Sequence, residues 1–108
     1  MDSWDIRSLE VEAHKPQVLM SVDAARAIVI DLPAGEEMQE HRTHEAGFLV
    51  VVDGEVEIQH EDESVSGSSG FFAYFPVLEN RRVLARSQAR LLLILGPWPG
   101  EGHPSARS

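Results

Sequence analysis

The chain has 108 residues, with 9 lysine and arginine residues against 18 aspartate and glutamate residues, and it contains no cysteine. This length fits a single domain. The formal net charge of −9 and the single lysine argue against nucleic acid as a partner, because a phosphate-binding face needs clustered basic side chains. Without cysteine, neither a disulfide framework nor a thiolate metal site can form.

The sequence also lacks the marks of export or membrane insertion. Its N-terminal residues are acidic, without the basic and apolar segments of a signal peptide. The apolar run over residues 91–95 is far shorter than the about 20 residues that a membrane helix needs. We therefore expect a cytoplasmic protein with no membrane partner.

Charge is unevenly distributed along the chain. Residues 1–63 carry 16 acidic and 4 basic side chains, whereas residues 64–108 carry 2 acidic and 5 basic ones. Four of those five are arginines between Arg81 and Arg90. Either two faces of one domain neutralise each other, or some of these arginines point inward at a site.

Hydrophobic periodicity predicts strands throughout the chain. Asp53-Gly54 lies between two of them and predicts a tight hairpin. The Ser/Gly-rich stretch that follows the second of these two strands predicts a loop, with a short strand around Val65. Short strands separated by turns indicate an all-β sandwich or small barrel. The predicted strands cover residues 25–32, 47–52, 55–59, 71–75, 81–86 and 89–95.

The strand over residues 81–86 has one face with fewer charges. That face holds Arg81, Val83 and Ala85, because side chains alternate along a strand. It is predicted to point inward and to take Arg81 with it.

Residues 35–54 resemble the first sequence motif of the cupins. In that family the motif reads Gly, five residues, His-x-His, three or four residues, Glu, six residues, Gly. Gly35, His41 and Gly54 fall in register with it.

A second cupin motif reads Gly, five residues, Pro-x-Gly, two residues, His, three residues, Asn. Gly70 and Pro76 match it, whereas Leu78 stands at the second glycine and Arg81 at the histidine. The resemblance implies an all-β double-stranded β-helix, the cupin jelly-roll barrel. We assign one such domain to residues 1–96, followed over residues 97–108 by a Pro/Gly-rich tail that is an extended arm or disordered.

In metal-binding cupins two histidines, a glutamate and the second-motif histidine bind a divalent metal. Transferred to this chain, those positions are His41, Thr43, Gly47 and Arg81, so only His41 is retained. A guanidinium donates hydrogen bonds only and cannot ligate a metal.

A different metal set remains open. Strand alternation points His44 away from His41, but a β-bulge or an early strand end would turn it inward. His41, His44 and Glu45 would then offer two imidazoles and a carboxylate, which suit Fe, Mn, Ni or Zn. This alternative is a metal-dependent enzyme of the oxygenase or isomerase type.

Our preferred hypothesis is a cupin that binds a small polar or anionic ligand in the barrel without a complete metal site, for regulation or sensing. The candidate ligand-binding residues are Gln39, His41, Thr43, Tyr74 and Arg81. An arginine at the barrel mouth favours a carboxylate or a phosphate, and the alternative role for Arg81 is an internal salt bridge. Whether the protein is an enzyme is left open.

The remaining histidines and tryptophans are assigned no place in the site. His14, His60 and His103 have no partners at ligand spacing, and Trp4 and Trp98 are expected to cover barrel ends or a dimer interface. Exposed edge strands need covering in a small sandwich, so we expect a homodimer. A third hypothesis therefore has no ligand site, and the barrel serves only for dimerisation.

Overall fold

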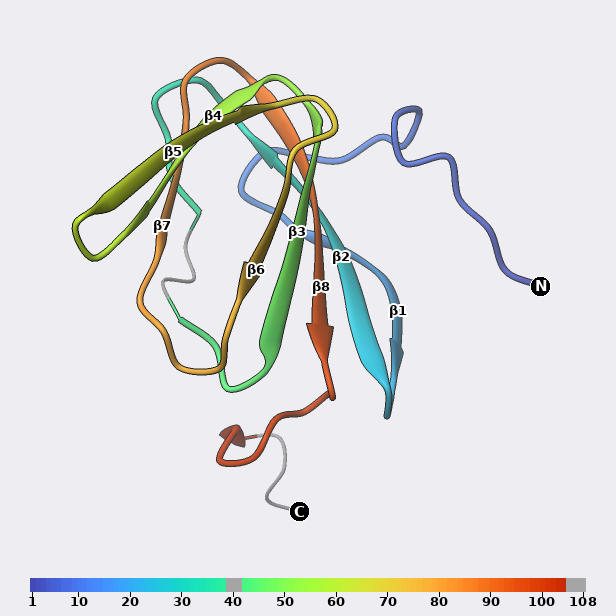
Figure 1. The fold of residues 1–108 in the computed structure, drawn as a ribbon. Helices are drawn as coiled ribbons and strands as arrows, with labels where there is room; N and C mark the ends of the chain where they lie inside the picture. Colours follow the sequence, from blue (N-terminus) through green and yellow to red (C-terminus); the bar gives the residue numbers. More distant parts are fainter. Residues whose placement is uncertain (39–41, 105–108) are drawn as a thin grey trace.

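The computed structural model describes residues 1–38 and 42–104 and contains eight strands in two antiparallel sheets (Figure 1). The five-stranded sheet has the order β1-β2-β8-β3-β6, and the three-stranded sheet has the order β5-β4-β7. Across the described part of the chain, no helix is long and apolar enough to cross a membrane. The strands are β1 (Gln17–Val22), β2 (Ala25–Leu32), β3 (Ala46–Asp53), β4 (Glu55–His60), β5 (Glu63–Ser68), β6 (Phe72–Phe75), β7 (Arg82–Ala85) and β8 (Ala89–Gly96).

The core lies between the two sheets and follows the alternation of side chains. On β8 every second residue is buried, which directs four apolar side chains inward, and β3 and β4 show the same pattern. The buried core residues include Leu49, Val51, Val56, Ile58, Phe75, Val83, Leu91, Leu93 and Leu95.

All six predicted strands are present, and no bound is shifted by more than one residue. β5 occupies most of the stretch that was predicted as a loop with a short strand around Val65. β1 was missed, because five of its six residues are exposed and its sequence shows no alternation of apolar and polar residues.

The predicted hairpin at Asp53-Gly54 is wrong. β3 and β4 belong to different sheets, so these two residues turn a corner between sheets instead of joining paired strands. Gly54 has φ 84°, and a Cβ there would overlap the carbonyl oxygen of Gln88. The Asp-Gly pair does mark a tight turn, but this turn connects strands of two sheets. The nearby Gln88 backbone leaves no room for a Cβ at residue 54, which explains the glycine.

Residues 35–38 extend the three-stranded sheet beyond β7. The amides of Gly35 and Met38 donate to the carbonyl oxygens of Ala85 and Val83, at 2.8 and 2.9 Å. The start of the first cupin-like motif thus lies against β7, the strand at the end of the second motif.

Leu78, at the position where the second motif expects glycine, has φ 59°. This left-handed conformation costs an L-residue about 1–2 kcal/mol. The Leu78 amide donates to the carbonyl oxygen of Thr43 at 2.8 Å, and this bond ties the loop to the end of the barrel. The backbone therefore keeps the conformation that the motif specifies although the residue has changed.

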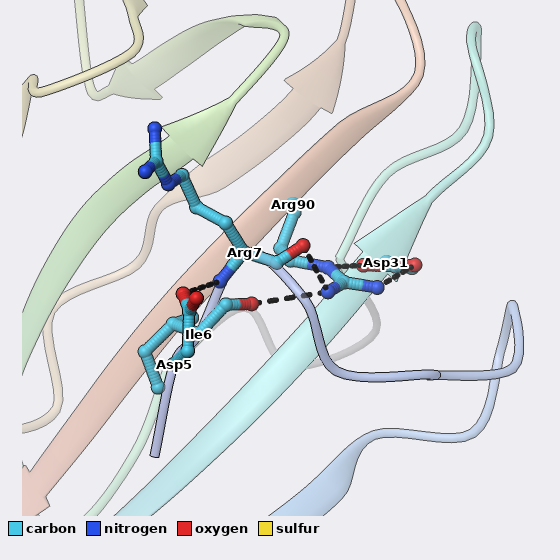
Figure 2. Close-up of polar contacts among 5 residues, drawn as sticks. All are labelled: Asp5, Ile6, Arg7, Asp31 and Arg90. Atoms are coloured by element: carbon cyan, nitrogen blue, oxygen red, sulfur yellow. Dashed lines mark hydrogen bonds and ion pairs between the residues drawn. The ribbon is translucent and has the colours of Figure 1, made fainter.

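The N-terminal segment is held on the five-stranded sheet by one arginine (Figure 2). The Arg90 guanidinium donates to both carboxylate oxygens of Asp31, at 2.7 and 2.9 Å, and to the carbonyl oxygens of Ile6 and Arg7, at 3.0 and 3.3 Å. Its hydrogen bonds with Asp31 raise the pKa of Arg90 above its ordinary value. Both side chains are largely buried, with 14% and 12% of their surfaces exposed.

We expect Arg90→Gln to destabilise the protein by about 2 kcal/mol, because it leaves the Asp31 carboxylate buried without its cation. Arg82→Gln is the matched control, since the Arg82–Glu37 pair has a 59% exposed arginine and should contribute below about 1 kcal/mol. Urea unfolding measures both. Equal unfolding midpoints for the two variants would show that Arg90 is not an anchor, as would unchanged hydrogen exchange at residues 6–8.

We expect Leu78→Gly to stabilise the protein by up to about 1 kcal/mol, because relief of the left-handed strain outweighs the greater entropy of unfolded glycine. Leu78→Ala is the control, since alanine retains the strained Cβ. Thermal unfolding of both variants tests the effect. A glycine variant less stable than the alanine variant would contradict it.

Candidate functional site

A cavity of about 470 Å³ runs along the inner face of β2. Its floor consists of apolar side chains that β2 and β8 direct inward, and its rim consists of residues 42–45 and the segment after β8. The apolar floor residues are Ile28, Ile30, Leu32, Leu93 and Leu95.

Three consecutive residues at the rim face this cavity. Thr43 and Glu45 are buried, and His44 is half-buried. β3 begins only at Ala46, so strand alternation does not apply to residues 42–45. Of the two arrangements left open, the early strand end is found, and His44 lines the cavity with its neighbours. Thr43 Oγ1 donates to the Glu45 carbonyl oxygen at 2.8 Å, which stabilises this turn.

The segment after β8 forms the other side of the rim. The Gly100 amide donates to Glu45 Oε2 at 2.7 Å, and the His103 ring packs edge-on against the His44 ring with centroids 5.7 Å apart. A Cβ at Gly100 would overlap the His44 carbonyl oxygen, so only glycine permits this approach. Over residues 97–104 the tail is thus packed on the barrel; residues 105–108 lie outside the described residues.

Arg26 is a cavity residue that sequence reasoning missed. Its guanidinium lies 4.4 Å from the ring centroid of Trp98, and both side chains line the cavity. The alternation of β2 would have placed Arg26 on the face of Ile28 and Ile30, a signal available in the sequence. Trp98 and His103 also lie at the rim. Trp98 was assigned to a barrel end or a dimer interface, and His103 was assigned no partner.

Arg81 faces inward, as predicted, but does not line the cavity. Its side chain is 1% exposed, and its guanidinium lies 4.9 Å from the Phe75 ring centroid. Val83 and Ala85 are buried on the same face of the strand, which confirms the alternation.

Tyr74 lies away from the cavity, on the outer face of β6, and is 54% exposed. It packs against Phe48, with ring centroids 5.3 Å apart, so the expectation that it lies beside the other candidates is wrong. Its inward-facing neighbours are Ala73 and Phe75, and alternation places Tyr74 outward. The homodimer stays a prediction.

The predicted ligands Gln39 and His41 lie outside the described residues. Of the proposed metal set, His44 and Glu45 are adjacent in the rim, and one carboxylate oxygen of Glu45 already accepts the Gly100 amide. Within residues 1–38 and 42–104, no three histidine, aspartate or glutamate side chains are grouped to bind a metal. With Arg81 at the second-motif histidine position, the described donor set does not fit a cupin metal centre.

The two other histidines form ion-pair contacts at the surface. His14 Nε2 lies 2.8 Å from Glu36, and His60 Nε2 lies 2.7 Å from Glu79. His14 also lines the outer part of the cavity. Neither histidine showed a partner at ligand spacing in the sequence, because each partner lies at least 19 residues away along the chain.

We expect Gly100→Ala to release the segment after β8 from the rim, because the added methyl group overlaps the His44 carbonyl oxygen. Glu101→Ala at the exposed neighbouring position is the control. In a Trp4→Phe background, the fluorescence of Trp98 should shift to the red and become more accessible to acrylamide in the glycine variant only. Identical spectra and quenching for the two variants would contradict the packing requirement.

Comparison with known proteins identifies the fold. No protein-family model matches the chain, and no curated protein matches it. An RmlC-like cupin protein from Desulfovibrio desulfuricans superimposes with a TM-score of 0.77 at 17% identity, over 90% of this chain and 97% of that one. A cupin superfamily protein from Desulfitobacterium hafniense gives a TM-score of 0.73 at 14% identity, over 82% and 83% of the two chains. An RmlC-like cupin with a double-stranded β-helix fold from Methanocaldococcus jannaschii gives a TM-score of 0.70 at 20% identity, over 83% of this chain and 87% of that one. The chain therefore has the cupin fold, a double-stranded β-helix, as its two sequence motifs predicted.

Proposed function

We propose that this protein binds a small organic ligand in the cavity along β2. The observation that carries the proposal is the cavity itself, whose 470 Å³ lies within the usual range for small-molecule sites of about 300–1,000 Å³. An apolar floor with a few polar groups at the rim is typical of such sites, because burial supplies affinity and the polar groups fix orientation.

The rim supports a polar or anionic ligand group. His44 offers a ring nitrogen at the cavity, and Arg26 and Arg42 bring positive charge to it. Gln39 and His41 remain part of the proposal as predicted ligand-binding residues. Binding in this site would suit a regulatory or sensing role.

The proposal is tested by filling the cavity. We expect Ile28→Trp to abolish the binding of fragments that the unmodified protein binds, because the indole occupies the apolar floor. Ile94→Trp is the matched control: Ile94 is the same residue type on the adjacent strand, and its side chain faces away from the cavity. Ligand-detected NMR with a library of small acids, amides, alcohols and amines measures binding.

Val18→Trp repeats the test at a more exposed cavity position, in case the Ile28 variant does not fold. A ligand at 100 times its dissociation constant should also stabilise the fold by about 2.7 kcal/mol. Fragments that bind all three variants equally would place the site elsewhere, and a library without any binder would favour a barrel that only dimerises.

The same preparation, purified without chelator, separates this proposal from a metal-dependent enzyme. Elemental analysis should show no stoichiometric Fe, Mn, Ni or Zn. Stoichiometric metal that is lost on His41→Ala or His44→Ala would overturn the metal-independent proposal.

A further inference from the structure

We infer that the ligand of this cavity is an organic carboxylate, whose carboxylate group binds Arg26 and whose apolar body lies along β2 and β8. The inference rests on the ligand-binding function proposed above and names the class of ligand. It follows from three features of the cavity: which charges are already paired, how Arg26 is held, and what lies beyond it.

The carboxylates that line the cavity already have partners. Asp31 accepts two hydrogen bonds from Arg90, and Glu37 accepts one from Arg82 at 2.7 Å. Glu45 accepts the Gly100 amide. A cationic ligand would therefore compete with bonds that the protein itself makes.

By contrast, the two arginines that line the cavity have no ion-pair partner among the described residues. These are Arg26 and Arg42. Among the same residues, the Arg26 Nε is buried without a hydrogen-bond acceptor. An anion that pairs with the Arg26 guanidinium would supply the counter-charge that this cation lacks, so we expect the cavity to favour negative charge.

Arg26 is held in a fixed position for such a contact. Its guanidinium stacks on Trp98 at 4.4 Å, and the Trp98 amide donates to the Asp23 carbonyl oxygen at 3.3 Å. A guanidinium stacked on an aromatic ring keeps its edge available for hydrogen bonds, and its planar fork matches the two oxygens of a carboxylate. Because Trp98 already holds the Arg26 side chain, that side chain loses little further rotamer freedom when a ligand binds.

The space beyond Arg26 is apolar. Ile28 and Ile30 follow on the same face of β2, and Leu95 and Leu93 lie opposite Arg26 and Ile28 on β8. Two residues along a strand advance by about 7 Å, so a body of that length reaches Ile28 from Arg26, whereas Ile30 lies about 13 Å along the strand. A short alkyl or aryl carboxylate has this shape, whereas inorganic phosphate would leave the floor uncovered.

Three probes with the same alkyl chain test the charge preference: hexanoate, hexanamide and hexylamine, with inorganic phosphate as a fourth. Isothermal titration calorimetry or protein-detected NMR gives each dissociation constant. We expect hexanoate to bind at least about tenfold more tightly than hexanamide, because a hydrogen bond to a charged partner is stronger than one to a neutral amide. Hexylamine and phosphate should bind more weakly than hexanamide.

Arg26→Gln should weaken the binding of hexanoate by about tenfold and that of hexanamide by less, because the neutral amide loses a weaker hydrogen bond. Arg7→Gln is the matched control, because it removes one exposed positive charge outside the cavity and should change neither. Arg26→Lys retains the charge without the planar fork, so it should lose only part of the hexanoate affinity. If Arg26→Gln does not fold, as judged by circular dichroism, the lysine variant carries the test.

The outcomes separate this inference from the proposed function. Equal affinity for acid and amide, abolished for both by Ile28→Trp, would overturn the carboxylate but retain the cavity as a ligand site. Tighter binding of hexylamine or phosphate would likewise overturn it. If none of the four probes binds while the fragment library yields other cavity ligands, the ligand class is wrong; if nothing binds in the cavity, both proposals fail.

Discussion

The register of β8 with its two neighbours determines how the cavity end of this barrel is built. Leu95 of β8 pairs with Arg26 of β2, and Gly96 pairs with Ala46 of β3. The segment that leaves β8 therefore starts between the inward arginine and the residues just before β3. From that position Trp98 reaches the guanidinium. A shift of β8 by one residue would reverse its faces and separate these groups, so the core that fixes the register also fixes the site.

The contact between Glu45 and Gly100 then closes the rim. A carboxylate with only 1% of its surface exposed is costly to bury, and a charge-assisted hydrogen bond from a backbone amide recovers part of that cost. Because a backbone amide is fixed on the chain, the bond positions the whole segment and not a single side chain. The Thr43 hydroxyl donates to the backbone carbonyl oxygen of Glu45, which fixes the backbone that carries this carboxylate. The rim is thus a joint between two segments that are 55 residues apart in sequence.

Local rules predicted most of the fold but only part of the site. Alternation identified the inward face of the strand over residues 81–86, and with it the burial of Arg81. The same rule, applied to residues 25–32, would have found Arg26. The rule failed for β1, because exposed residues need not alternate between apolar and polar. It also failed for His44, because this residue precedes β3. Contacts such as that between His44 and His103 join residues 59 apart and arise from topology, so no local pattern contains them.

Two inward arginines lie in different surroundings in this acidic protein. Arg81 is enclosed against Phe75 and does not line the cavity. Arg26 lies at the cavity itself and can make direct contact. The net charge of −9 resides on the whole chain, and repulsion between exposed charges is screened beyond about 8 Å at physiological ionic strength. At short range the nearest charges dominate, so in the binding we propose the charges that line the cavity, and not the net charge of the chain, select the ligand.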